Sequence, residues 1–537
     1  MIVSRRDVLA GATALGLAGN ASAVTRAPGR FEPTWQSLSA GFKAPDWFRD
    51  AKFGIWAHWG PQGVGMAGDW YARKMYIQGD PFYERHVRDW GHPSKTGYID
   101  MIGHWKAERW EPSKLLDLYQ RAGARYFMAL ANHHDNFDTF ASKHHAWNAT
   151  RIGPKRDILG TWEKLVRQRG LKFGVSNHGS HAWHWFQTAY GYDPEGPLKG
   201  VRYDAHRLTV ADGKGKDWEG LDPQQLYTGP NMVMPDGIDT IAAAKDWHQK
   251  NDRVWTEEAP VQNPAFTANW VARAKDLVDS YRPDMLYFDN LESLPLGQAG
   301  LDVTAYFYNR GLEWHGGKVE VVATAKQLPA DKAGAVLEDV ERGFYSAIAD
   351  HPWQTDTCLG DWFYDDKILA EHRYKSARTV VHLLCDTVAK NGTLMLNVPM
   401  RPDGTIDEDE HQILTEIGDW IAVNGEAIYA TRPYKVFGEG PTRREGGMFG
   451  ERNAKPFTAQ DVRYTTKGKT LYAIALGKPE TGVLKLTSVA GETVARVEML
   501  GRKGPLKVEK ADDALLVTLP PDIPPTTPAI ALRLSLA

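Results

Sequence analysis

The sequence contains very little cysteine: among 537 residues only Cys358 and Cys385 occur. A framework of disulfides is therefore excluded as the main source of stability, although one bridge between these two residues stays open. The length exceeds what a single hydrophobic core usually supports. We therefore expect two or three domains, each held by its own packing.

The chain also lacks a large excess of charge and a long apolar run. Its formal net charge of −3 gives no reason to expect nucleic acid or an anionic membrane as a partner. The apolar run near the N-terminus is too short and too rich in glycine to span a bilayer. Aromatic residues are plentiful instead, with 20 Trp and 21 Tyr, and such rings suit stacking on the C–H faces of sugars.

The first residues have the order of an export signal. Residues 4–10, SRRDVLA, form a twin-arginine pattern, and a mild apolar run leads to Ala21-Ser22-Ala23. A positive region, an apolar region and an A-x-A site in this order predict a signal peptide over residues 1–23. We expect export by the twin-arginine route to the periplasm or the medium. The alternative is a frayed N-terminal helix.

Strand-like and helical patterns alternate from residue 53 onward. The strand-like runs are 53–57, 125–130, 171–175, 285–288, 319–322 and 394–398, and the helical patterns are 113–123, 160–170, 266–282 and 374–390. This alternation is typical of a parallel sheet, and the length favours a closed barrel over an open sheet. We predict an α/β fold with a (β/α)8-like barrel catalytic domain over residues 24–434.

Two stretches depart from this alternation. Residues 190–255 are rich in Gly, Pro and Asp and are too long for a plain connection, which predicts an insertion at the active site. After residue 434 the helical patterns stop, and short strand-like runs separated by turn residues follow. They predict a C-terminal β-sandwich domain over residues 435–537.

Polar residues follow directly after most of the predicted strands. They include His58, the pair His133-His134, His178 and Asp289. In a parallel barrel the carboxyl ends of all strands meet on one face, where active sites form. A carboxylate placed directly after Leu-Tyr-Phe is costly to desolvate unless it is used or paired. We therefore expect these side chains to share one active site.

Several segments carry a family resemblance: KFGIWAHWGP, GDWYARKMY, AGARYFMALANHHDNF, RPDMLYFDN, VAKNGTLMLNVPMRPDGTI and IGDWIAVNGEAIYATRPY. Over about residues 35–434 the chain resembles glycoside hydrolase family 29, the α-L-fucosidases, and its β-rich tail is similar to the tail of that family. The resemblance implies a retaining, exo-acting enzyme that releases α-L-fucose from fucosylated oligosaccharides or polysaccharides. It implies double displacement between two carboxyl groups, with no metal and no other cofactor.

The resemblance also implies which carboxyl groups react. The Trp-Phe-Asp-Gly-like motif of the family nucleophile appears at residues 287–290 as YFDN, which makes Asp289 the expected nucleophile. The acid/base of the family precedes a Trp-Glu-Thr-like motif, which appears at residues 353–355 as WQT. Glu341, twelve residues before this motif, is the expected acid/base, and Glu338 is the alternative.

A further set of residues matches positions that bind the sugar in the family. The expected substrate-binding residues are His58, Asp69, Trp70, His133, His134, His178, Tyr287 and Trp353. Four departures from the family pattern bear on substrate preference: Asp69 stands for the usual Glu, Ser176-Asn177-His178 for Tyr-Tyr-Ser, Tyr287 for Trp and Lys326 for Arg.

Other functions stay open beside this one. An α-L-galactosidase is one, because α-L-galactose differs from α-L-fucose only by a C6 hydroxyl. An apolar pocket rejects an added hydroxyl only weakly, by roughly 100-fold. A metal-dependent hydrolase using His133, His134, Asp135 and Asp289 is another, although no Cys/His spacing fits zinc. The last is a carbohydrate-binding protein without catalysis.

Overall fold

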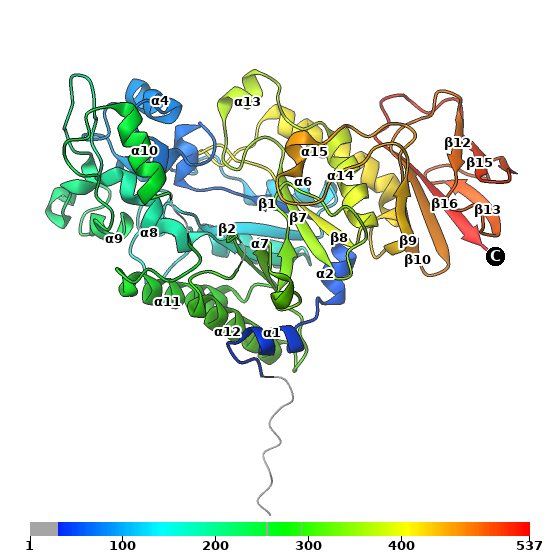
Figure 1. Cartoon of the computed structure of the whole chain (residues 1–537), viewed down its shortest axis with the longest axis horizontal. Helices are drawn as coiled ribbons and strands as arrows, with labels where there is room; N and C mark the ends of the chain where they lie inside the picture. Colours follow the sequence, from blue (N-terminus) through cyan, green and yellow to red (C-terminus); the bar gives the residue numbers. More distant parts are fainter. Residues whose placement is uncertain (1–29, 254–255, 292) are drawn as a thin grey trace, which may run out of the picture. The chain divides into compact units, whose positions relative to one another are not determined.

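Eight parallel strands close into a barrel in the order β1 to β8 (Figure 1). The computed structural model describes residues 30–253, 256–291 and 293–537, so the predicted signal peptide lies outside the described residues. The barrel closes where β1 pairs with β8, with Phe53 opposite Leu394. This architecture confirms the predicted fold class.

The barrel strands and the helices have the following bounds. The strands are β1 (Phe53–Ala57), β2 (Tyr126–Asn132), β3 (Lys172–Asn177), β4 (Met285–Phe288), β5 (Val322–Lys326), β6 (Leu337–Asp339), β7 (Trp353–Cys358) and β8 (Gly392–Asn397). The helices are α1 (Trp35–Gly41), α2 (Asp46–Ala51), α3 (Tyr71–Lys74), α4 (Pro81–Trp90), α5 (Tyr98–His104), α6 (Pro112–Arg121), α7 (Ile158–Gln168), α8 (Ala182–Trp185), α9 (Pro223–Leu226), α10 (Ile241–Asn251), α11 (Pro264–Tyr281), α12 (Gln298–Trp314), α13 (Asp366–Ala370), α14 (Ala377–Ala389) and α15 (Glu408–Asn424).

Most predicted elements lie where the patterns placed them. The strand expected at 319–322 begins only at Val322, because Val319 and Glu320 precede the ladder. The sequence patterns missed β6, which has three residues, and β7, whose WQTDTC is mostly polar. Within the stretch 190–255, α10 forms a regular helix capped by Thr240, whose side chain accepts the N–H of Ala243.

Large apolar side chains fill the barrel interior. Trp56, Tyr126, Met128, Met285 and Tyr287 belong to one buried cluster inside the strands. Position 54 has room only for glycine, because the ring of Tyr126 lies 2.2 Å from the position that a Cβ would take. The packed interior leaves the carboxyl ends of the strands as the place for a cavity.

The C-terminal residues form two antiparallel sheets. The first has the order β13-β16-β11-β10-β9 and the second the order β12-β15-β14. Their bounds are β9 (Arg432–Glu439), β10 (Val462–Lys467), β11 (Thr470–Ala475), β12 (Val483–Leu486), β13 (Val494–Met499), β14 (Val508–Lys510), β15 (Leu515–Thr518) and β16 (Ile530–Leu536). Both sheets contribute to one apolar core, which includes Leu471, Leu484, Val517 and Leu532, as in a sandwich. The predicted boundary between residues 434 and 435 falls inside β9.

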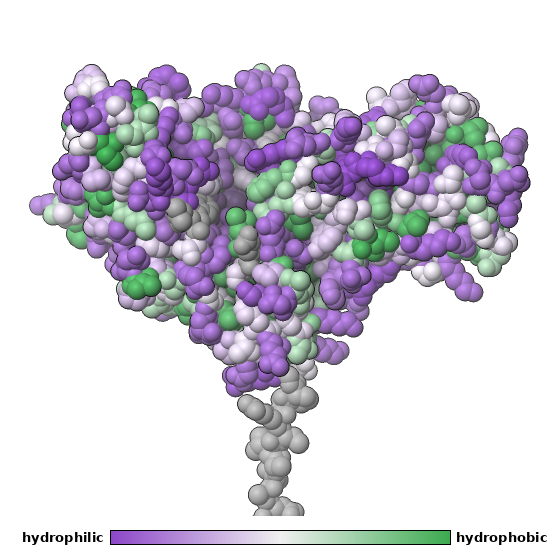
Figure 2. All heavy atoms as spheres, in the orientation of Figure 1, coloured by the Kyte–Doolittle hydropathy of each residue, from purple (hydrophilic) through white to green (hydrophobic). Residues whose placement is uncertain are grey.

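The two cysteines are unpaired, and the visible surface is mostly hydrophilic. Cys358 and Cys385 are both buried and free, so the bridge left open by the sequence is not formed. Hydrophilic residues cover most of the face in Figure 2, and hydrophobic ones lie in small separate groups. Among the described helices, none is both long and apolar enough to cross a membrane.

Candidate active site

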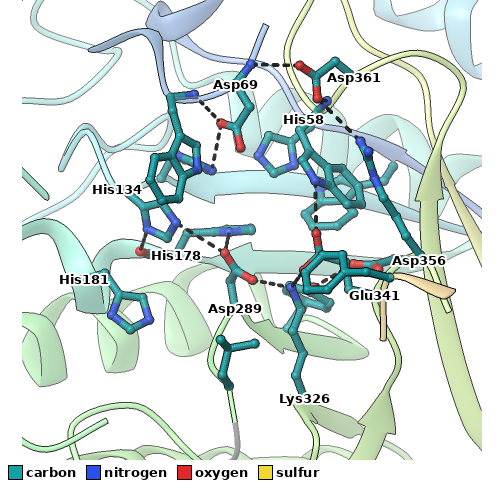
Figure 3. A pocket seen from close by; sticks show the side chains of 18 of the residues that line it. His58, Asp69, His134, His178, His181, Asp289, Lys326, Glu341, Asp356 and Asp361 are labelled. Atoms are coloured by element: carbon teal, nitrogen blue, oxygen red, sulfur yellow. Dashed lines mark hydrogen bonds and ion pairs between the residues drawn. The ribbon is translucent and has the colours of Figure 1, made fainter. Parts of the chain in front are cut away.

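A cavity of about 560 Å³ opens at the carboxyl ends of the barrel strands (Figure 3). It is lined by Trp56, His58, Asp69, Trp70, His133, His134, His178, His181, Arg253, Tyr287, Asp289, Leu291, Lys326, Glu341, Arg342, Asp356, Asp361, Trp362, Phe449 and Arg452. The structure thus brings together most of the residues that the sequence predicted for the site.

Asp289 follows β4 directly and faces this cavity. His178 Nδ1 lies 3.0 Å and His134 Nε2 3.4 Å from its Oδ2, while Lys326 Nζ contacts Oδ1. Burial would raise the pKa of Asp289, but the charge of Lys326 and the two histidine contacts outweigh it and hold the pKa well below its usual range. Its side chain is still 22% exposed. Asp289 is therefore an ionised carboxylate that a ligand can reach.

Lys326 connects Asp289 to the second carboxylate. Its Nζ lies 2.6 Å from Glu341 Oε2, and Glu341 Oε1 accepts the indole N–H of Trp362 at 3.2 Å. Figure 3 shows Lys326 between Asp289 and Glu341. Burial disfavours the charge of Lys326, but the adjacent Asp289 and Glu341 raise its pKa well above the usual value. One ammonium group thus contacts both carboxyl groups.

Five histidines form one wall of the cavity: His58, His133, His134, His178 and His181. Burial lowers the pKa of His58 and His133 well below the usual value, that of His178 to about 4 and that of His181 to about 3. Neither ring nitrogen of His58 has a hydrogen-bond partner among the described residues, nor has Nε2 of His178. A neutral imidazole offers one donor and one acceptor, which suits the hydroxyl groups of a sugar. The unpaired nitrogens therefore indicate a polar ligand.

Asp69 and Trp70 enter the cavity from the segment before α3. Asp69 Oδ1 lies 3.9 Å from His133 Nε2 and accepts the backbone N–H of Trp70 at 2.8 Å. Burial and the nearby Asp361 raise the pKa of Asp69 well above its usual value. Trp70 has a φ of 72°, a costly conformation for a bulky residue that this packing maintains.

A second layer of carboxyl groups lies beneath Lys326. The hydroxyl of Tyr287 lies 2.7 Å from Asp356 and 3.3 Å from Asp339, both fully buried. Burial raises the pKa of Asp356 to about 7, and burial together with Asp356 raises that of Asp339 well above the usual value. Tyr287, predicted to bind substrate, therefore lines the cavity, while its hydroxyl contacts the buried carboxyl groups of Asp356 and Asp339.

Two residues that the sequence placed at the site lie away from the cavity. Asp339 of β6 points into the barrel, so its neighbour Glu338 points outward, where it accepts the hydroxyl of Tyr345. Trp353 at the start of β7 is buried, and its indole N–H donates to the carbonyl of Lys390 at 2.9 Å. Alternation along the strands thus removes both from the cavity, while Glu341 follows β6 and reaches it.

The sequence reasoning missed several cavity residues. Asp356, Asp361 and Trp362 lie on or after β7, so recognising that strand would have pointed to them. Arg253 ends the stretch predicted as an insertion. Two further residues, Phe449 and Arg452, come from beyond the predicted barrel domain and had no local signal.

The segment with Phe449 holds the loop that carries Glu341. The backbone N–H of Phe449 donates to the carbonyl of Glu341 at 2.8 Å, and that of Glu451 to the carbonyl of Arg342 at 2.9 Å. Arg342 and Phe449 both have positive φ angles, of 44° and 58°. Strained residues persist where surrounding contacts fix them, so this pairing positions the second carboxylate.

Two groups of side chains in the cavity could hold a metal ion. They are His58 with His133 and His178, and His134 with His178 and Asp289. The ligand atoms of each group lie within 4.8 Å of one another. A set of three nitrogens suits Zn²⁺ among biological metals.

A parallel barrel whose strand ends present two carboxyl groups across a polar cavity is the arrangement of a glycoside hydrolase. A family model described as alpha-L-fucosidase matches residues 19–426, and one for the alpha-L-fucosidase C-terminal domain matches residues 455–535. The chain belongs to the α-L-fucosidase family of glycoside hydrolases.

Individual relatives agree with this membership. The chain is 27% identical to the tissue alpha-L-fucosidase of Homo sapiens, covering 95% of this chain and 92% of that protein. It is 26% identical to the human plasma alpha-L-fucosidase, over 91% and 89%. Among solved structures, the Thermotoga maritima alpha-fucosidase in complex with fucose has a TM-score of 0.68 at 23% identity, covering 94% of this chain and 100% of that one. Its likeness shows the shared fold.

Proposed function

We propose that this protein is a retaining, exo-acting α-L-fucosidase that releases α-L-fucose from fucosylated glycans. The contact of one ammonium nitrogen with Asp289 and Glu341 carries this proposal. Two hydrogen-bond lengths limit the distance between the facing oxygens to about 6 Å. Carboxyl groups of retaining enzymes lie roughly 5–5.5 Å apart and those of inverting enzymes roughly 6.5–9.5 Å. The limit supports the retaining geometry.

In the first step Asp289 attacks the anomeric carbon while the carboxylic acid of Glu341 protonates the departing oxygen. The bond to the leaving group breaks, and an ester between Asp289 and the sugar forms with inverted configuration. In the second step Glu341, now a carboxylate, takes a proton from water. The water attacks the same carbon, the ester breaks, and the sugar leaves with its original configuration.

Lys326 contacts the negatively charged carboxylate in both steps. Before the first step the charge lies on Asp289, and after it the charge lies on Glu341, because the ester is neutral. Since Lys326 Nζ contacts both side chains, the same ammonium is a counterion in each state. We assign it a positioning and electrostatic role rather than a proton transfer, because its pKa is raised.

The proposal is tested with Asp289→Ala. Activity should fall by several orders of magnitude, and external azide should restore turnover as a β-fucosyl azide of inverted configuration. Arg502→Ala, an exposed change in the turn between β13 and β14, is the control. NMR of the first wild-type product should show the α anomer before mutarotation. Normal turnover by a folded Asp289→Ala protein, or a β anomer as the first product, would reject the mechanism.

The choice of sugar is a separate point. Relative kcat/KM on the nitrophenyl α-L-fucoside and α-L-galactoside decides between the two sugars, and we expect the fucoside to be preferred by roughly 100-fold. A metal-dependent hydrolase is the second candidate, favoured by the histidine groups that could hold an ion. It predicts loss of activity on prolonged EDTA treatment, whereas double displacement predicts none.

We further propose that residues 1–23 direct export by the twin-arginine route. The basis is the order of the SRRDVLA pattern, the apolar run and the A-x-A site. Changing Arg5 and Arg6 together to Lys should leave the enzyme in the cytoplasmic fraction, whereas the unchanged chain should appear in the periplasm or medium. Equal distribution of both chains would contradict this proposal.

A further inference from the structure

The mouth of the cavity carries two arginines that no carboxylate neutralises. Arg253 and Arg452 line the cavity and are exposed, in contrast to the buried histidine wall. Arg253 Nη1 donates to the amide oxygen of Gln249 at 2.9 Å. Among the described residues no Asp or Glu lies within ion-pair distance of either arginine, whereas Arg342 of the same cavity is paired with Asp361 at 3.5 Å. The two exposed guanidinium groups keep most of their donors available.

Each of these arginines lies over an aromatic ring. The guanidinium carbon of Arg253 is 5.4 Å from the ring centre of Trp70, and that of Arg452 is 5.1 Å from the ring centre of Phe449. A ring contact restrains the guanidinium while its N–H groups at the edge stay available. A guanidinium restrained in this way can bind a carboxylate or a sulfate through two parallel hydrogen bonds.

Positive charge continues beyond Trp70 and Arg253. These two residues also line a neighbouring hollow of about 250 Å³, together with Lys74 and Lys245. The amine of Lys245 donates to the backbone carbonyl of Gly79 at 2.6 Å, and that of Lys74 lies 4.7 Å from the ring of Phe82, so neither loses its charge to an acid.

Most of the acidic groups that line the cavity and the hollow either contact a cation or have a raised pKa. Asp80, in the hollow, accepts the N–H of Phe82 at 3.0 Å as the cap of α4, and its single negative charge stands against those of Arg253, Lys74 and Lys245. In the cavity Asp361 is paired with Arg342, and burial together with Asp361 raises the pKa of Asp69. The carboxylates Asp289 and Glu341 share Lys326. Among the described residues that line the cavity and the hollow, cations without an acidic partner therefore outnumber acids without a cationic partner.

We propose that the leaving-group side of the cavity binds an anionic glycan, in which the sugar next to the released residue carries a carboxylate or a sulfate ester. This inference rests on the proposed α-L-fucosidase function and adds the class of the leaving group. Arg253 and Arg452 receive the oxyanion, and Lys74 and Lys245 attract further charge along a longer chain. The chemical steps at Asp289 and Glu341 are unchanged.

The test compares three disaccharides that share the fucosyl residue and the linkage. Their second sugars are galactose, galacturonic acid and galactose 6-sulfate, and a nitrophenyl α-L-fucoside reports catalysis without a second sugar. We expect kcat/KM for at least one anionic disaccharide to exceed that for the neutral one by about tenfold or more. The larger of the two preferences identifies carboxylate or sulfate. In roughly 0.5 M salt the preference should shrink, because exposed charges are screened.

Variants attribute the preference to the rim. Arg253→Gln and Arg452→Gln should each lower the ratio of anionic to neutral kcat/KM several-fold, whereas Arg502→Gln, in the exposed turn between β13 and β14, should leave it unchanged. Equal kcat/KM for all three disaccharides, or a preference that survives both substitutions, overturns the inference while leaving the fucosidase function intact. Failure to cleave any fucoside, including the nitrophenyl compound, overturns both.

Discussion

Replacing Lys326 by Met removes the cation that contacts both of the proposed catalytic carboxyl groups. Its amine contacts Asp289 and lies 2.6 Å from Glu341, and the lysine side chain is only 3% exposed. Two unit charges about 4 Å apart interact by about 4 kcal/mol at an effective dielectric constant of about 20. Since each 1.36 kcal/mol is about tenfold in rate, the loss of kcat/KM has a ceiling of about a thousandfold, and we expect roughly 100-fold.

The pH profile separates an electrostatic role from a structural one. Burial raises the pKa of Asp289, and the charge of Lys326 is the main effect that lowers it. Without this charge the pKa of Asp289 rises, so the acidic limb of the kcat/KM profile should move to higher pH. The loss of activity in Lys326→Met should therefore be largest at acidic pH, where more of the carboxylate is protonated.

Lys326→Arg is the matched control, because it keeps the charge with a different shape. It should restore the acidic limb to the wild-type position, even if its kcat stays below that of the wild type. Thermal unfolding of both variants checks that they are folded. If a folded Lys326→Met protein keeps both limbs and most of its kcat/KM, the lysine does not set the charge of the catalytic pair and the reasoning is refuted.

Two further predictions concern Glu341 and Asp356. Glu341→Ala should reduce turnover of substrates with poor leaving groups far more than that of nitrophenyl substrates, and its pH profile should lose the alkaline limb. Azide should yield product of retained configuration. Glu338→Ala should show none of these effects, and the reverse pattern would reassign the acid/base. Burial raises the pKa of Asp356 to about 7, so the native state holds a proton that the unfolded chain releases above about pH 4, and the contribution of this residue to wild-type stability decreases as the pH rises from about 4 to 7. Urea unfolding of Asp356→Asn should therefore show a gain in stability relative to wild type that grows across this window; a constant difference would contradict the prediction.

The strand ends could be predicted because local patterns encode them. The apolar run before Asp289 and the one before His58 are continuous, so both side chains were placed at the carboxyl end of the barrel. The polar strand β7 gave no such signal, because Gln354 and Asp356 point into the barrel and bond to Asp339 and Tyr287. Its inward face is polar, and a hydrophobic pattern could not reveal it.

The rim of the cavity could not be predicted from the sequence. Arg253, near the end of the stretch predicted as an insertion, and Phe449, from beyond the barrel, come to line the same cavity only through tertiary packing. Spacing to Trp353 selected Glu341, but the sequence did not place Trp353 itself correctly relative to the cavity, because its strand was not recognised. Motif matching gives a position along the chain, whereas strand alternation decides the direction of each side chain.

The backbone pairing of Phe449 with Glu341 limits how this protein can be recombined with its relatives. A chimera joined after residue 434 would bring a foreign segment to the loop of the second carboxylate, because the N–H groups of Phe449 and Glu451 come from beyond that junction. A junction after residue 454 keeps both donors with their acceptors but separates β9 from β10, its partner in the first C-terminal sheet. The choice of crossover point therefore decides whether the loop of Glu341 keeps its backbone partners. The part of the chain that supports the active site extends past the end of the barrel.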